Sequence, residues 1–528
     1  DEGEGVFTTD KAPKTLRHMA LEAIEQTHFY PENGKTRLRD MIANRPDWCI
    51  SRQRSWGVPV PFLLHQDSHE LHPDTLAILD VAANMVEQGG IEAWSRASVA
   101  DIHAKLLAMG LGQSADPAHY RKSTDILEVW FDSGSTFAHV LRGSHRHAYD
   151  RAPFHEVGPE ADLYLEGHDQ HRGWFHSSLL LGCALYDRAP YRGLLTHGFA
   201  TDGQGRKMSK SLGNTVVPQE VSGTLGAEIL RLWVAATDYS GELSISPEIL
   251  KRVVESYRRI RNTLRFLLAN LSDFDPQTDA VAITDLVEID RYALVMTQAA
   301  QDEITADYAR YQFHSMTQKI QSFCSEDLGG FYLDILKDRL YTTTVDGQAR
   351  RSAQTALWHI TGALLRWMAP VLSFTAEEAW ALYSAQADDS VLFHPWEPLP
   401  KVNDADTLSQ YWQRLRALRA DAARELEAVR AAGGIGSSLA AELELHATPE
   451  RQAFLARFAA DLKYALIVSA VRVVPADQDR IVVVPSTHPK CERCWHLVPD
   501  VGQHVEHPTL CGRCIGHLGH TPEQRLYA

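Results

Sequence analysis

At 528 residues the chain is too long for one ordinary hydrophobic core, so two to four domains are expected. With 44% hydrophobic and 23% charged residues it has the composition of a soluble globular protein, and its formal net charge of -16 excludes a protein coated in positive charge for nonspecific nucleic-acid binding. No apolar run approaches the ~20 residues of a membrane span, so no membrane is expected as a partner. The chain begins at Asp1 without a methionine or a leader, and we expect it to be a fragment of a longer protein.

Residues 1–46 open with an acidic, glycine-containing stretch followed by a helical pattern, LRHMALEAIEQ, and are too short to form a domain. The string DWCISRQRSWGVPVPFLLH comes next, and its apolar part is interrupted by Pro59 and Pro61. Proline removes a ladder hydrogen bond, so this part is predicted to be an edge strand or an extended segment. Trp56, taken alone, would be read as a packing residue.

Residues 65–122 are polar and contain two helical stretches, at 74–87 and 99–109, which indicate a peripheral insertion. His65, His69 and His72 have no metal-ligand spacing and are expected on the surface. The string STDILEVWFDSGST, at 123–136, alternates apolar and polar residues and predicts a return to the core in extended form, ending in an Asp-Ser-Gly turn.

The stretch from 162 to 216 carries the main chemical signals. DLYLEG predicts a strand that ends at Gly167, and HRGWFHSSLLLGCALY predicts the buried helix that follows it. In open α/β sheets, ligands bind where strands turn into helices, and Glu166, Gly167, Asp169 and Gln170 stand at that turn. Glycine lets a nucleotide approach the backbone, and a carboxylate accepts hydrogen bonds from ribose hydroxyls or an ammonium group.

The string KMSKS lies in a glycine-flanked loop at 203–213 and places Lys207 and Lys210 three residues apart. Two ammonium groups on a mobile loop can close on the negative charge that builds on a departing polyphosphate. A lone KxxK would more simply be a solvated basic turn, but this one follows the EGHDQHRGWF string.

Residues 241–400 are predicted to be largely helical. Between 251 and 265 there are six Lys or Arg residues against the single Glu255, which makes one helix face basic in an acidic chain. A solvated helix face is the plain alternative. Pro370 is expected to separate two helices, and Trp358, Trp367 and Trp380 are expected in the core.

Residues 401–528 contain a helix, two short β-like runs, AELELHA and DRIVVVPS, and the cysteine pattern CxxC, sixteen residues, CxxC. Cys491, Cys494, Cys511 and Cys514 at this spacing can bind one tetrahedral Zn²⁺, and with all four positions filled the site is predicted to be structural. Nearby histidines, at 496, 504 and 507, could substitute, but four thiolates suffice. The other three cysteines are scattered, as in proteins of a reducing cytoplasm.

The strings ISRQRSWGVP, STDILEVWFDSGST, EGHDQHRGWF and KMSKS, in this order, resemble the bacterial isoleucyl type of class I aminoacyl-tRNA synthetase. The resemblance implies the C-terminal half of an α/β Rossmann-like core, an α-helical anticodon-binding bundle and a small α+β zinc-binding domain. Residues 1–46 would then be the tail of an editing-domain insertion, 47–240 the catalytic part with its insertion at 65–122, 241–400 the anticodon-binding domain, and 401–528 the C-terminal domain, with zinc knuckles at 491–514.

The resemblance also implies roles for single residues. Glu166 would contact the aminoacyl-adenylate, and Gly167, Asp169 and Gln170 would line its ribose and aminoacyl portions. His168 stands where the family has a small residue such as serine. The remaining implied roles are ATP binding by Met208, Ser209 and Lys210, polyphosphate stabilisation by Lys207 and Lys210, walls of the isoleucine pocket at Trp56 and Trp174, and tRNA binding by Arg258, Arg259 and Arg261.

The family joins isoleucine to ATP, with Mg²⁺, and transfers the aminoacyl group to tRNA(Ile); a cytoplasmic monomer with one structural Zn²⁺ is expected. The family's second motif, HIGH, is missing: the similar string at 514–517 follows KMSKS and contains a zinc ligand, Cys514. We therefore expect the isolated chain, which also lacks the editing site, to be inactive. Two alternatives stay open: a valyl-type synthetase, and a fragment that binds tRNA without chemistry of its own.

Overall fold

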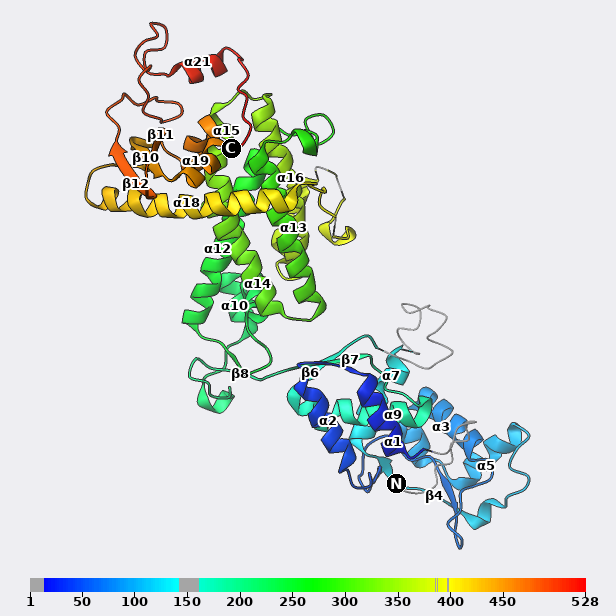
Figure 1. Ribbon diagram of the computed structural model, residues 1–528. Helices are drawn as coiled ribbons and strands as arrows, with labels where there is room; N and C mark the ends of the chain where they lie inside the picture. Colours follow the sequence, from blue (N-terminus) through cyan, green and yellow to red (C-terminus); the bar gives the residue numbers. More distant parts are fainter. Residues whose placement is uncertain (1–13, 142–160, 385, 387, 397) are drawn as a thin grey trace. The chain divides into compact units, whose positions relative to one another are not determined.

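The computed structural model describes residues 14–141, 161–384, 386, 388–396 and 398–528 (Figure 1). The chain forms two compact units, one made of residues up to Phe199 with Tyr239–Glu242, the other of Ala200–Asp238 with Leu243–Ala528. Each unit has a hydrophobic core of its own. No helix in the described ranges is both long and apolar enough to cross a membrane.

The first unit is built on a three-stranded parallel sheet with the strand order β1-β7-β6. Because the strands are parallel, their carboxyl ends lie at one edge of the sheet, which carries Tyr30, Gly167 and His197. The strands of this unit are β1 (His28–Tyr30), β2 (Ser51–Arg52), β3 (Leu63–His65), β4 (Tyr120–Lys122), β5 (Ile126–Leu127), β6 (Tyr164–Gly167) and β7 (Gly193–His197). Its α-helices are α1 (Leu16–Gln26), α2 (Asn33–Ala43), α3 (Thr75–Gly89), α4 (Ile91–Arg96), α5 (Val99–Ala108), α6 (Val129–Gly134), α7 (Thr136–His139) and α9 (Trp174–Tyr186).

The strand, turn and buried helix predicted between residues 162 and 186 are confirmed. β6 is followed by a 3-10 turn, His168–Arg172, and then by α9, in which every residue from Phe175 to Cys183 is buried. This stretch of α9 therefore lies in the interior of the first unit. α9 packs in one core with α1 and with the strand residues Tyr164 and Leu194.

Two local expectations in this unit were wrong. Only Ile126 and Leu127 of the 123–136 string are extended, and α6 begins directly afterwards because the Glu128 carboxylate accepts the backbone N–H of Trp130 at 3.1 Å and caps the helix. His72 is buried, not exposed. Its imidazole packs on Tyr120, with ring centroids 4.7 Å apart.

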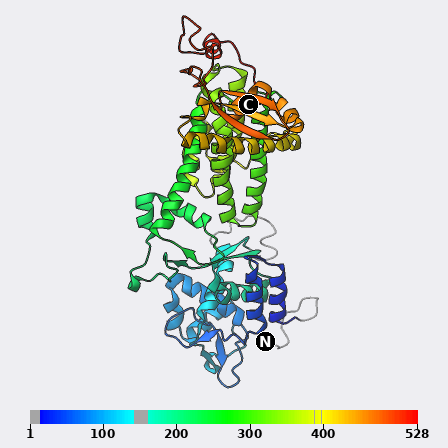
Figure 2. The same ribbon diagram turned by 60° about the vertical axis from the view of Figure 1, so that its left-hand side comes forward.

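The second unit is mainly helical, and α18 runs across the long bundle helices (Figure 2). Pro370 separates α16 from α17, as predicted. The α-helices are α10 (Pro218–Leu225), α11 (Ala227–Ala236), α12 (Pro247–Asn270), α13 (Glu288–Ala309), α14 (Phe313–Ser322), α15 (Leu333–Thr342), α16 (Gln348–Met368), α17 (Ser373–Tyr383), α18 (Ala405–Ala431), α19 (Pro449–Ala456), α20 (Leu462–Leu466) and α21 (Gly512–Leu518), and a π-helix, Phe323–Tyr332, joins α14 to α15. The strands are β8 (Ala200–Thr201), β9 (Leu243–Ser244), β10 (Ala441–Ala447), β11 (Ala470–Pro475) and β12 (Arg480–Pro485).

A buried ion pair holds three helices of the bundle together. Asp290 on α13 and Arg339 on α15 are almost fully buried and share two hydrogen bonds, of 2.6 and 2.9 Å. The hydroxyls of Tyr332 and of Ser352, on α16, also donate to the Asp290 carboxylate. A buried carboxylate is tolerated when every oxygen is hydrogen-bonded in this way, so the network fixes the relative positions of α13, α15 and α16.

The C-terminal sheet has β10 in the middle, parallel to β11 and antiparallel to β12. The residues of β10 alternate strictly between buried and half-buried, as the AELELHA pattern predicts for a strand with one face on a core. β12 was also predicted, whereas β11 was not.

Candidate functional site

The turn after β6 is held by its own side chains. Gln170 Nε2 donates to Asp169 Oδ2 at 3.0 Å, and Gln170 Oε1 accepts the backbone N–H of Trp174 at 3.0 Å, at the start of α9. A Cβ atom on Gly167 would lie 2.6 Å from Asp169 Oδ1, so a larger residue there would displace the exposed Asp169 carboxylate from its present position. Glu166 and Asp169 are exposed, which leaves two carboxylates available to a ligand at the end of the strand.

Trp174 is a fixed apolar surface beside this turn. Its indole stacks on Tyr164, with ring centroids 4.1 Å apart and planes 8° from parallel, and its Nε1 donates to Thr136 Oγ1 at 2.9 Å. Burial raises the pKa of Tyr164 to about 12, so this phenol stays neutral. The indole of Trp56 is 77% exposed, and in the described part of the chain it makes no ring contact with Trp174.

His168 links the ends of two neighbouring strands. Its Nδ1 donates to the carbonyl oxygen of His197, at the end of β7, at 3.3 Å, and its ring packs edge-on against Phe199, with centroids 5.1 Å apart. A serine in this place could not reach both neighbours. We infer that His168 holds the turn in place.

The KMSKS loop belongs to the second unit, and an aspartate anchors its base. Asp202 accepts hydrogen bonds from Asn214 Nδ2 (3.0 Å), from Arg206 Nε (2.8 Å) and from the backbone N–H groups of Gln204 and Arg206. The hydrogen bond from Asn214 is the largest cause that holds the pKa of Asp202 well below its usual range. Sequence analysis missed Asp202 and Asn214, although the Asp-Gly and Gly-Asn pairs are turn signals.

Within the loop, Ser209 Oγ accepts the backbone N–H of Leu212 at 3.2 Å, and the Ser209 N–H donates to Asn214 Oδ1 at 2.9 Å. Met208 packs against the core of the second unit. The side chains of Lys207 and Lys210 are exposed. The loop therefore has a fixed base and presents its lysines to solvent.

The basic face of α12 is present, but its arginines differ in their partners. Arg261 donates to both carboxylate oxygens of Glu378 on α17, at 2.8 and 2.9 Å, and these hydrogen bonds raise its pKa. Arg258 is exposed and paired with Glu255 on its own helix at 2.7 Å. Within the described ranges the exposed cations without an ion pair on this helix are Lys251, Arg252, Arg259 and Arg265.

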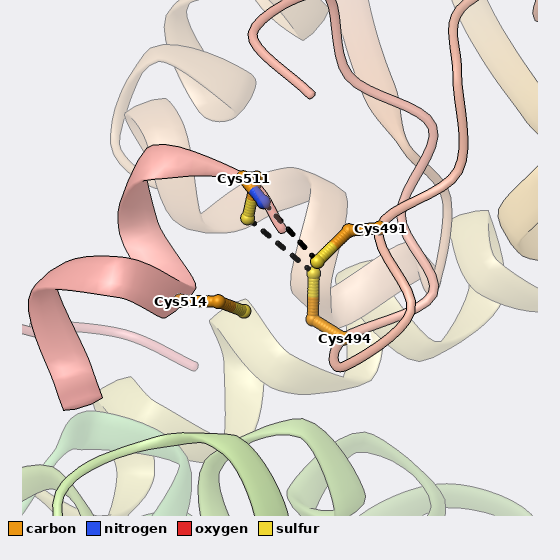
Figure 3. Close-up of side chains that lie close together, drawn as sticks. All are labelled: Cys491, Cys494, Cys511 and Cys514. Atoms are coloured by element: carbon orange, nitrogen blue, oxygen red, sulfur yellow. Dashed lines mark hydrogen bonds between the residues drawn. The ribbon is translucent and has the colours of Figure 1, made fainter. Parts of the chain in front are cut away.

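Four cysteines form the predicted metal cluster. Figure 3 shows their sulfur atoms pointing toward one another, two from the loop before α21 and two from the start of that helix. All four Sγ atoms lie within 4.8 Å of one another, and the Sγ atoms of Cys494 and Cys511 are 3.8 Å apart. A tetrahedron with Zn–S bonds of about 2.3 Å has edges of about 3.8 Å, so the cluster fits Zn²⁺.

The chemistry of the cluster supports the same conclusion. The four cysteines are buried, and hydrogen bonds from the thiols of Cys494 and Cys514 lower the pKa of Cys511, which favours a thiolate there. Bound Zn²⁺ deprotonates its thiol ligands outright. The four side chains fill a tetrahedral shell, so Cys491, Cys494, Cys511 and Cys514 form a structural zinc site.

A second hydrogen-bond network holds the C-terminal segment that contains the four cysteines against the helical bundle. Arg513, between the ligands of the second knuckle, binds both oxygens of Asp338 on α15, and Arg525 binds the same carboxylate at 2.7 Å. Burial alone would raise the pKa of Asp338, but the two guanidinium groups lower it to about 2. The segment is therefore held to α15 by a buried charge cluster.

Three family models match the chain. That of the class I tRNA synthetases (I, L, M and V) matches residues 10–246, that of the anticodon-binding domain of tRNA ligase matches 290–445, and that of a zinc finger found in FPG and IleRS matches 489–515. The turn and the two-lysine loop lie in the first match and the four cysteines in the third.

Curated relatives agree. The chain is 57% identical to the isoleucine–tRNA ligase of Thiobacillus denitrificans over 97% of its own length and 53% of that protein. It is 55% identical to that of Azoarcus sp. over 97% of its own length and 54% of that protein, so it spans about half the length of these relatives. A solved ternary complex of Agrobacterium radiobacter K84 agnB2 LeuRS with tRNA and LeuAMS covers 68% of this chain, and this chain covers 43% of it, with 21% identity and a TM-score of 0.50, a likeness of fold alone.

Proposed function

The chain belongs to the class I tRNA synthetases, and from this membership we propose that it is part of an isoleucine–tRNA ligase, which activates isoleucine with ATP and Mg²⁺ and transfers it to tRNA(Ile). The observation that carries the proposal is that one chain holds a ligand turn at the end of a parallel strand, a two-lysine loop and a four-thiolate zinc site. We further propose that the whole protein acts as a cytoplasmic monomer.

The residues of this chain divide the activation step between them. Glu166 and Asp169 offer carboxylates to the adenylate, Gly167 keeps the backbone clear for it, and Gln170 holds the turn against α9. The face of the Trp174 ring that is turned away from Tyr164 suits an aliphatic side chain, with Trp56 as the proposed second wall. Lys207 and Lys210 would meet the polyphosphate, with Met208 and Ser209 holding the loop between them.

Amino-acid choice can be tested on a full-length protein in which this chain is joined to the part of the Thiobacillus denitrificans relative that it does not match. Isoleucine should support ATP–pyrophosphate exchange faster than valine by roughly ten- to two-hundredfold. This is the usual discrimination that one methylene group gives in a hydrophobic pocket, and isoleucyl enzymes are a known example of it. The measurement is kcat/KM for each amino acid. A preference for valine would make the protein a valyl-type enzyme, and the 528-residue chain alone should give no exchange with either.

We propose that α12 contacts tRNA through exposed guanidinium groups, which can bind phosphates. Arg259 has no ion pair in the described structure, and the exposed pair of Arg258 with Glu255 costs little to break. Arg258→Glu/Arg259→Glu should weaken tRNA(Ile) binding by at least tenfold at low salt, and the slope of log affinity against log salt should flatten by about one for each lost phosphate contact. Filter binding over a range of salt concentrations measures both.

Arg261→Glu needs a separate measurement, because it also breaks the pair with Glu378. Arg261→Gln and Glu378→Gln are therefore compared: if Arg261 touches tRNA, only the first should weaken binding. A matched control is Arg424→Glu/Arg430→Glu on α18, where both arginines are exposed and paired on their own helix. If the α12 and α18 double variants bound tRNA equally well, the basic face of α12 would be a solvated surface that does not contact tRNA.

A further inference from the structure

A cavity of about 1100 Å³ lies in the first unit, at the carboxyl ends of the strands, beside α2 and the start of α9. Among the described residues that line it, Asp40 supplies the one carboxylate. Residues 166, 167, 169 and 170, which we assign to the adenylate, are not among the described residues that line it. Its basic and imidazole side chains are Arg37, Arg45, Arg172, His168, His171, His176 and His197.

The wall of the cavity contains buried polar atoms without a hydrogen-bond partner. His176 is 4% exposed, and neither of its ring nitrogens has a partner among the described residues. The same holds for Nε2 of His171, which lies against Gly34, and for Nε of Arg45. Buried polar groups in folded proteins are nearly always hydrogen-bonded, so three such groups around one cavity point to a ligand that accepts hydrogen bonds.

The charges around His176 indicate the sign of that ligand. Burial, together with the positive charges of Arg45 and Arg172, lowers the pKa of His176 to about 4. Burial likewise lowers the pKa of His171. Both imidazoles are therefore neutral at pH 7 and can donate an N–H, and guanidinium groups donate only. An anion with several acceptor oxygens satisfies the imidazoles and offsets the repulsion between the cations.

We propose that this cavity binds backbone phosphates of tRNA, an inference that rests on the tRNA-binding function proposed above. Phosphate oxygens match guanidinium groups in geometry as well as in charge. The cavity is much larger than one phosphate group, and its hydrogen-bond donors are spread around it. This arrangement favours the linked phosphates of an RNA backbone over a free polyphosphate. Arg37 and Arg172 are exposed at its surface, and Arg45 and His176 lie deeper.

The test uses the 528-residue chain and a tRNA(Ile) transcript. Arg45→Gln/Arg172→Gln should lower affinity at least tenfold at low salt and flatten the salt slope by one to two, since each lost phosphate contact removes about one. Arg39→Gln is the control, because Arg39 lies on α2, pairs with Glu25 and does not line the cavity in the described structure. It should bind like the unchanged chain, and thermal unfolding checks that both variants fold.

A second measurement does not depend on how the double variant folds. In the unchanged chain with ¹³C-labelled histidines, the His176 ring signal, assigned with His176→Gln, should move on adding tRNA, and the pKa of His176 should rise as phosphate approaches. Inorganic pyrophosphate is the comparison probe. A signal that responds to pyrophosphate but not to tRNA would overturn the choice of RNA.

The remaining outcomes separate this inference from the function on which it rests. If tRNA binds, the double variant keeps its affinity and salt slope, and the His176 signal does not move, the cavity is no phosphate site while tRNA binding stands. If the unchanged chain does not bind tRNA at all, both the tRNA-binding function and the cavity assignment are wrong.

Discussion

Removing Zn²⁺ from the four-cysteine site should unfold the segment around residues 489–519 and leave the helical bundle intact. Apparent binding free energies of structural zinc in small zinc domains are roughly 10–16 kcal/mol, far more than a segment this short can recover by packing. The cysteines form a cluster of their own, separate from the core of the bundle, so the loss should stay local. The full chain should contain one zinc by elemental analysis.

The decisive variant is Cys511→Ser/Cys514→Ser, which removes one knuckle. It should contain no zinc, and its amide hydrogens from 489 to 519 should exchange much faster, while those of α13 and α16 should keep their protection. Cys49→Ser is the control, because Cys49 is an exposed free thiol outside the cluster. A metal-free chain with four reactive cysteines and full protection of this segment would show that the fold does not need the ion.

Replacing Lys210 with alanine should slow adenylate formation by about a hundredfold in the rebuilt full-length enzyme. One preorganised charge contact made mainly in the transition state is worth ~3 kcal/mol, and its loss lowers the rate more than it raises the KM for isoleucine. Transfer of isoleucine from preformed adenylate to tRNA should suffer less, because no polyphosphate departs in that step. Single-turnover measurements of the two steps separate these effects.

Lys105→Ala is the matched control for Lys210→Ala, since it removes an exposed lysine from α5, outside the loop and the turn. It should leave both steps unchanged. If Lys210→Ala slowed transfer as much as activation, or left activation within about twofold of the unchanged enzyme, the proposed role of the loop would be wrong. The loop would then be a structural turn anchored by Asp202.

Much of the candidate site could be predicted because its signals are local in sequence. Gly167 follows an alternating apolar run and marks the end of β6. The apolar stretch after it is too long for a strand, so its length predicts a buried helix, α9. The spacing of Cys511 and Cys514 also predicts their geometry, because two intervening residues allow both thiolates to bind one ion. The same spacing logic predicted the amphipathic α12.

The sequence by itself determined the strand, turn and helix around Gly167, the bundle helices and the four zinc ligands, because periodicity and spacing act within a few residues. Only the tertiary structure decided which charges are free, where β11 pairs and what lines the cavity beside α2. Arg261 appears in the sequence as one more cation of a basic face, yet its partner, Glu378, is 117 residues away. The physical reason is that a long-range ion pair, a parallel strand pair and a cavity wall each form between segments that are distant in sequence. These segments come together only when the whole unit folds, so local sequence patterns do not predict their contacts.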